Sequence, residues 1–179
     1  MSIETIRGIV ANLRKRYGNI YTDELCDALN VTVLYHGMGK SQDACKGFYT
    51  CQSRIKMAVV NADLPEKYQG VILAHELGHG VLHNDYKVHA FEEFEMFDSR
   101  SVCEYEANIF AAELLLPDEE VLEFLNDDMS FFQAAACLYV PPELLDFKFR
   151  VLKRLGYEVN NPLTSNSNFM KNIDREERF

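Results

Sequence analysis

The chain has 179 residues, a formal net charge of −10, and 47% apolar or aromatic residues. This composition excludes a wholly disordered chain, and the negative charge argues against nonspecific binding to nucleic acid or anionic membranes, which requires a positive surface. No apolar run approaches the roughly 18 residues of a membrane helix, and the scattered cysteines contain no CxxC pair. We therefore expect a globular cytoplasmic protein with reduced thiols.

The hydrophobic pattern predicts helices, then a few strands, then helices alone. Apolar side chains spaced three and four apart mark the helices, and β-branched runs bounded by polar turns mark the strands. The expected helices cover residues 3–17, 22–29, 65–83, 101–116, 117–126, 130–138 and 141–155, and the expected strands are 31–36 and a hairpin over 47–60. This order predicts the α+β class, with a small antiparallel sheet packed against helices and an all-helical C-terminal part.

Two segments have no clear period. Residues 84–99 are acidic and aromatic, which indicates an irregular connection and a candidate lid, although a solvated loop is the simpler interpretation. From residue 160 the composition turns to Asn, Ser and charged residues, so a flexible tail is expected over 159–179.

The sequence HELGH at residues 75–79 lies inside the long helix expected over 65–83. A helix places residues i and i+4 on one face, so His75 and His79 can direct both imidazoles at one zinc ion. Glu76 is rotated about 100° from His75 and can reach a water held on the metal, which is the position of a general base. Gly78 is unfavourable inside a helix, which indicates close approach by another helix or strand.

A catalytic zinc site needs a third protein ligand. The helix expected over 101–116 carries Glu104 and Glu106, which lie about 160° apart around the helix, and their spacing alone does not choose between them. Glu113 lies in an apolar run, so we expect it to have a partner such as a ligating histidine or a backbone group, although a surface position is the alternative. His83 continues the histidine stripe, but three in-line residues converge poorly on one ion, which favours a structural or pocket-lining role.

The motifs resemble those of the ImmA/IrrE family of metallopeptidases, which is typically encoded beside a helix-turn-helix repressor in prophages and mobile elements. The matching segments are KGFY at 46–49, the strand ending in Asn61, HELGHGVLH at 75–83 and EYEANIFAAELLLP at 104–117. The resemblance implies that His75, His79 and Glu106 bind one zinc ion, which selects Glu106 over Glu104. It also implies that Glu76 is the general base and that a partner transcriptional repressor is cleaved.

We therefore expect a metallopeptidase domain over residues 1–126, a helical extension over 127–158 and the tail over 159–179. The predicted function is a zinc-dependent endopeptidase whose substrate is a helix-turn-helix repressor, although Mn²⁺ or Fe²⁺ can also occupy such a site. The alternative is a stoichiometric antirepressor that binds its repressor without cleavage and uses the metal structurally.

Residues 130–157 resemble a degenerate helix-turn-helix pattern with a basic last helix. The basic side chains on that helix are Lys148, Arg150, Lys153 and Arg154. Because the whole chain is acidic, plain helical packing is the favoured interpretation and direct binding to nucleic acid is not expected.

Overall fold

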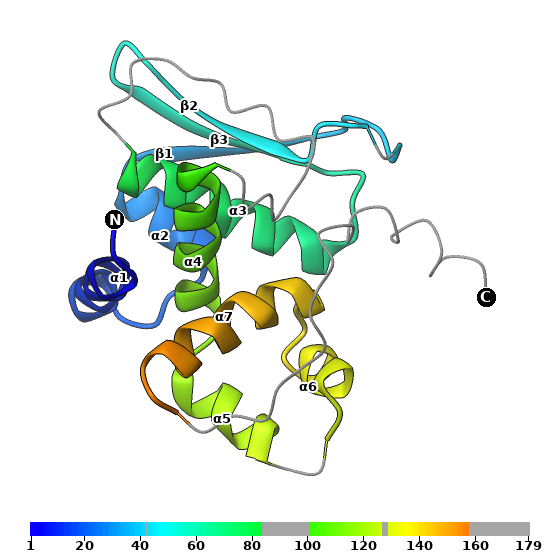
Figure 1. Ribbon diagram of the computed structural model, residues 1–179. Helices are drawn as coiled ribbons and strands as arrows, with labels where there is room; N and C mark the ends of the chain where they lie inside the picture. The colour runs from blue at the N-terminus through cyan, green and yellow to red at the C-terminus, as the bar shows by residue number, and fades with distance from the viewer. Residues whose placement is uncertain (42, 84–100, 127–128, 158–179) are drawn as a thin grey trace.

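The computed structural model describes residues 1–41, 43–83, 101–126 and 129–157, so the expected lid and tail lie outside the described residues. The elements are α1 (Ile3–Tyr17), α2 (Thr22–Ala28), β1 (Val31–His36), β2 (Gly47–Gln52), β3 (Ile55–Asn61), α3 (Glu66–Leu82), α4 (Val102–Leu115), α5 (Asp118–Asn126), α6 (Phe131–Cys137) and α7 (Pro142–Arg154). The labelled helices all lie on one face of the sheet (Figure 1). The predicted α+β class is confirmed. Among the described helices, none is both long and apolar enough to span a membrane.

The sheet is mixed rather than antiparallel throughout, with strand order β1–β3–β2. Strand β3 pairs antiparallel with β2 and parallel with β1. The turn of the hairpin consists of Ser53 and Arg54, both with positive φ (51° and 69°), as in the two-residue turns that match the twist of a hairpin. The connection over 37–46 is long enough to start β2 two strand spacings from β1, roughly 10 Å away, so β3 returns between them.

The buried side chain of Asn61 holds this connection in place. Its Oδ1 accepts hydrogen bonds from the backbone N–H groups of Met38 (3.1 Å) and Asp63 (3.0 Å). Its Nδ2 donates to the carbonyls of Gly39 (2.8 Å) and Cys45 (2.9 Å). All four hydrogen-bonding positions of the amide are therefore used, and the end of β3 fixes the path of the chain into β2.

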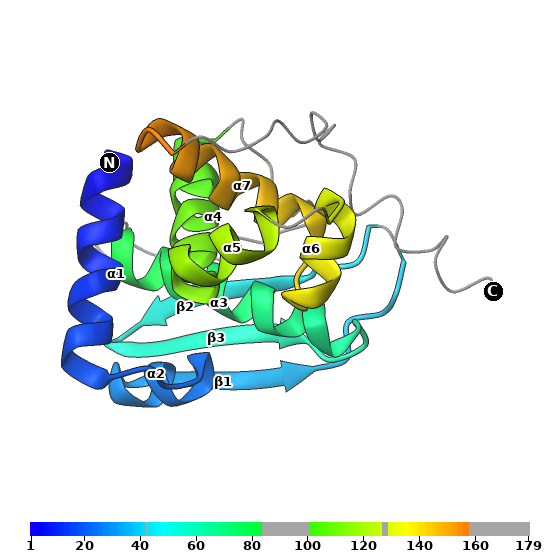
Figure 2. The same ribbon diagram turned by 90° about the horizontal axis from the view of Figure 1, so that it is seen from below.

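Helix α3 lies between the sheet and α4, and small residues permit both contacts. A Cβ on Gly78 would lie 3.1 Å from the Phe110 ring and 3.3 Å from the backbone of Ala107 in α4. A Cβ on Gly80 would lie 2.6 Å from the ring of Tyr49 in β2. Figure 2 shows α4, α5 and α7 in front of α3, and α3 in front of the sheet. The close approach predicted at Gly78 is confirmed.

One hydrophobic core connects α1, the sheet and the later helices. Helix α4 is buried along most of its length, and Leu144, Leu145, Val151 and Leu152 of α7 belong to the same core cluster as Ile109 of α4. The expected C-terminal extension thus packs directly on α4, whereas the proposed boundary at residue 126 stays a prediction.

Four charged side chains, here called the charge network, join α1, α4, α5 and α7. The Nζ of Lys148, which is 1% exposed, lies 2.6 Å from Oε1 of Glu113 and 2.5 Å from Oδ1 of Asp118. The Arg7 guanidinium lies 2.9 Å from Oε2 of Glu113 and 2.8 Å from Oδ2 of Asp118. Glu113 therefore has two cations as partners, not the ligating histidine expected from the sequence.

The contacts of the basic side chains on α7 reduce the exposed positive charge that was expected on the last helix. Lys148 points into the core, and Arg150 forms an ion pair with Asp146 on its own helix at 2.6 Å. Arg154 lies 3.6 Å from Glu4 of α1. These contacts are those of a packed helix, in line with the favoured interpretation.

Candidate metal centre

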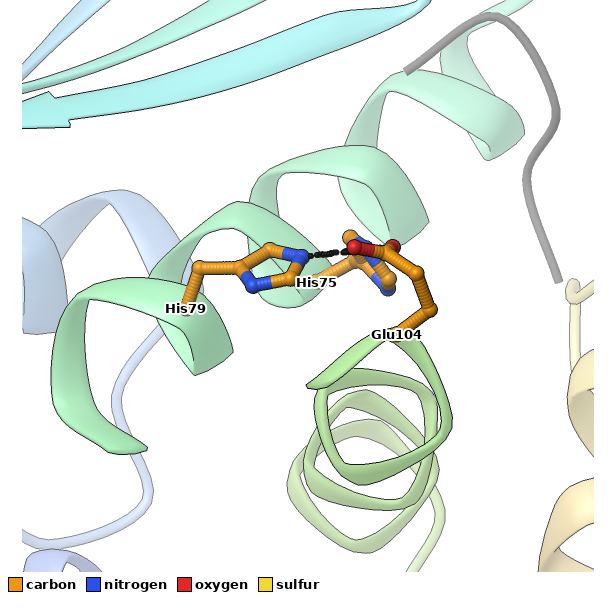
Figure 3. Close-up of side chains that lie close together, drawn as sticks. All are labelled: His75, His79 and Glu104. Atoms are coloured by element: carbon orange, nitrogen blue, oxygen red, sulfur yellow. Dashed lines mark hydrogen bonds and ion pairs between the residues drawn. The ribbon is translucent and has the colours of Figure 1, made fainter. Parts of the chain in front are cut away.

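Three side chains from two crossing helices converge on one point and could hold a metal ion. They are His75 and His79 of α3 and Glu104 in the first turn of α4, and we call them the metal cluster. The Nε2 atoms of the two histidines lie 3.0 Å apart. Oε2 of Glu104 lies 3.3 Å from Nε2 of His75 and 3.4 Å from Nε2 of His79. Figure 3 shows Glu104 reaching from the start of α4 toward both rings.

These separations fit a tetrahedral metal ion. Two ligand atoms at about 2.0–2.1 Å from zinc are roughly 3.3 Å apart when the angle between them is tetrahedral. The observed separations are 3.0, 3.3 and 3.4 Å. Two imidazole nitrogens that face one another so closely also need a proton or a cation between them, because both otherwise present lone pairs. Three protein ligands leave a fourth position for water or substrate.

The structure places Glu106 outside the metal cluster, whereas the resemblance implies that Glu106 is the third ligand. Oε2 of Glu106 lies 3.0 Å from Nε2 of His83, and the Met1 ammonium contacts the same carboxylate. Residues two apart on a helix leave it in widely different directions, so only one of Glu104 and Glu106 can face the histidine pair. The first turn of α4 directs Glu104 there.

Asn108 lies beside the metal cluster, although its sequence position had not suggested a role there. It is fully buried, and its Oδ1 lies 2.9 Å from Nδ1 of His75. A hydrogen bond from Nδ1–H to this oxygen leaves Nε2 of His75 unprotonated and directed at the metal cluster. Asn108 follows Glu104 by four residues and therefore shares its helix face. That spacing was the available signal for both Asn108 and Glu104.

His83 lies beside the metal cluster rather than in it. Its Nδ1 lies 3.2 Å from Nδ1 of His79, on the side of that ring away from His75. Burial, followed by the neighbouring His79, lowers the pKa of His83 to about 4, so the ring is neutral at neutral pH. The predicted role outside the ligand set agrees with this position.

Glu76 is fully buried on the face of α3 that packs against β2. A Cβ on Gly47 of β2 would lie 3.2 Å from Oε1 of Glu76 and 2.5 Å from the side chain of Ile72. The absence of a side chain at Gly47 thus permits the β2 backbone to lie against this carboxylate, which places an edge strand of the described sheet next to the HELGH segment.

Comparison with known proteins identifies the family of the chain. A model of the peptidase family M78, described as the IrrE N-terminal-like domain, matches residues 26–150. The chain belongs to this family. The resemblance to the ImmA/IrrE metallopeptidases is therefore confirmed, and α3 and α4 with the candidate metal cluster lie within the matched residues.

Two relatives agree with this assignment. The chain is 33% identical over 143 residues to a protein of Bacillus phage phi105 named "Uncharacterized immunity region protein 2", which covers 80% of this chain and 88% of that protein. It is 28% identical over 157 residues to Metallopeptidase ImmA of Bacillus subtilis strain 168, which covers 83% of this chain and 88% of that protein.

Proposed function

We propose that this protein is a zinc-dependent endopeptidase with His75, His79 and Glu104 as metal ligands and Glu76 as general base. The observation that carries the proposal is the convergence of two Nε2 atoms and one carboxylate oxygen at separations of 3.0–3.4 Å. Two imidazoles and one carboxylate with room for a fourth ligand are the donor set of catalytic zinc sites. Membership of a peptidase family supports the same reaction class.

Different residues of the chain have different roles in the proposed peptide hydrolysis. His75, His79 and Glu104 would hold a metal ion, which would polarise a peptide carbonyl and lower the pKa of a water molecule. Glu76 takes a proton from the attacking water and passes it to the leaving amine. Asn108 keeps Nε2 of His75 available for the metal because its Oδ1 accepts a hydrogen bond from Nδ1–H of that ring. A substrate in extended form can pair with the edge of β2, which lies against the same face of α3.

The substrate that we propose is a helix-turn-helix repressor encoded beside this protein in a prophage or mobile element. Support comes from the two relatives, one of which is named for a phage immunity region and the other as a metallopeptidase. Cleavage of such a repressor would release its operator.

The test mixes the purified protein with the repressor encoded next to its gene and follows new fragments by mass spectrometry. The Glu76→Gln variant should retain bound metal and lose roughly 10²–10⁴-fold in cleavage rate, because only the general base is removed. Glu66→Gln is the matched control, since Glu66 is an exposed carboxylate in the first turn of the same helix.

The outcomes separate the proposal from its alternative. New repressor fragments with the wild-type protein and with Glu66→Gln, but not with Glu76→Gln, support proteolysis. An intact repressor that leaves its operator equally well with wild type and Glu76→Gln would instead establish stoichiometric antirepression.

A further inference from the structure

The hydrogen-bonded chain at the metal cluster continues past His79 into two further buried side chains. His83 is 7% exposed and Glu106 is 5% exposed. Nδ1 of His83 lies 3.2 Å from Nδ1 of His79, and Nε2 of His83 lies 3.0 Å from Oε2 of Glu106. The three side chains therefore form one line from the metal cluster into the contact between α3 and α4.

A metal on His79 permits one arrangement of protons along this line. Metal binding at Nε2 requires that the neutral ring of His79 carry its proton on Nδ1. That N–H must donate to Nδ1 of His83, which then carries its own proton on Nε2. The Nε2–H of His83 in turn donates to Oε2 of Glu106, which as a carboxylate only accepts. Each N–H group on the line then faces a hydrogen-bond acceptor.

We propose that His83 and Glu106 are positioning residues that orient His79 and raise its basicity as a metal ligand. The proposal rests on the proposed ligand set of His75, His79 and Glu104. It also gives Glu106 a function at the site that differs from direct ligation. The two ligating histidines are then unequal, because His75 donates to the neutral amide of Asn108 while His79 donates into a line that ends in a carboxylate.

The first test is the affinity of the purified full chain for zinc, measured by competition with a chelator. His83→Phe keeps a planar ring but removes both nitrogens, and we expect it to weaken zinc binding by roughly 10–100-fold, as is typical for partners of ligating histidines. Glu106→Gln retains an acceptor but removes the charge, so we expect a smaller loss. Glu113→Gln is the control, since it removes an equally buried carboxylate from the same helix without touching this line.

A double variant distinguishes the line of hydrogen bonds from general packing. Because Glu106 acts through His83, adding Glu106→Gln to His83→Phe should cause no further loss of zinc affinity. A loss of equal size in both backgrounds would overturn the proposal, and so would wild-type affinity in His83→Phe.

Histidine ¹⁵N spectra of the zinc-loaded wild-type protein give a readout that needs no variant. The proposal expects the proton of His83 on Nε2 and that of His79 on Nδ1, and the opposite tautomer of His83 would overturn it. Failure of the ligand set has a different signature. In that case Glu104→Gln binds zinc like the wild type, or Glu106→Gln alone abolishes binding whether or not His83 is present.

Discussion

Helix α4 carries a buried polar cluster near each end, and the two differ in how their charges are balanced. Near its end, Glu113 meets Lys148 and Arg7, so the charge network contains two carboxylates and two cations of the chain itself. Near its start, Glu104 meets two imidazole nitrogens that face one another. This difference distinguishes a structural network from a ligand site. In the charge network each carboxylate is paired with a cation, whereas in the metal cluster the lone pairs of two nitrogens and one oxygen are directed at the same point.

The largest expected effect comes from removing a carboxylate from each cluster in turn. Glu104→Gln should lose zinc binding by more than the roughly 10–100-fold that outer partners of ligating histidines contribute. Because Glu104 is only partly buried, the metal-free variant should unfold at nearly the wild-type urea concentration. Metal content and urea unfolding in the presence of chelator measure the two effects separately.

Glu113→Gln should show the reverse pattern, with normal zinc content and reduced stability. It leaves Lys148 buried with one charged partner fewer, and an uncompensated buried charge is strongly destabilising. If Glu113→Gln lost metal while Glu104→Gln kept it, the distinction between the two clusters would be wrong.

The next largest effect is expected for the buried lysine of the charge network. Lys148→Met should lower the free energy of unfolding by about 3–5 kcal/mol, because Glu113 and Asp118 then share only Arg7. Lys153→Met is the matched control on the same helix, since Lys153 is exposed, and it should change stability by less than about 0.5 kcal/mol. Equal effects of the two substitutions, measured by urea unfolding, would mean that the charge network does not stabilise the fold.

Local patterns predicted most of the elements, because helices and strands depend on short-range spacing. The strand at residues 31–36 and the helix at 3–17 have the bounds that the sequence indicated, and the long helix starts one residue later and ends one residue earlier than expected. The parallel pairing of β1 with β3 was not predictable in this way, since it depends on where the connection over 37–46 runs.

The choice between Glu104 and Glu106 as the carboxylate that faces the two histidines was not predictable for a similar reason. Helical spacing gives the angle between Glu104 and Glu106 but not the rotation of α4 about its axis. That rotation depends on packing, in which the backbone at Ala107 lies against Gly78. Asn108 is the residue from which it could have been inferred, because a buried amide one turn after Glu104 indicates which side of α4 faces the histidines.

Metal removal should lower the stability of the protein moderately, and this effect should depend on the metal cluster alone. Zinc at about 100 times its dissociation constant stabilises a folded protein by roughly 2.7 kcal/mol relative to the metal-free form. We therefore expect a chelator to lower the Tm of the wild-type protein and of Lys148→Met by similar amounts. Glu104→Gln should show no such shift, and a chelator-dependent Tm in that variant would place the stabilising metal elsewhere.

The smallest expected effect is a pH dependence confined to the charge network. Burial opposes ionisation of Asp118, but hydrogen bonds from Arg7 and Lys148 hold its pKa at about 2. The unfolded chain has a carboxyl pKa near 3.9, so between these values the unfolded state binds more protons and stability falls as the pH falls from about 4 toward 2. Above that window the contribution of Asp118 is fully present and constant.

Asp118→Asn should therefore reduce the slope of unfolding free energy against pH below about pH 4 by up to one proton. Glu119→Gln, an exposed neighbour on the same helix, should keep the wild-type slope. Measurement in the presence of chelator keeps the metal cluster out of the comparison, and an unchanged slope in Asp118→Asn would show that the two cations do not hold this carboxyl ionised.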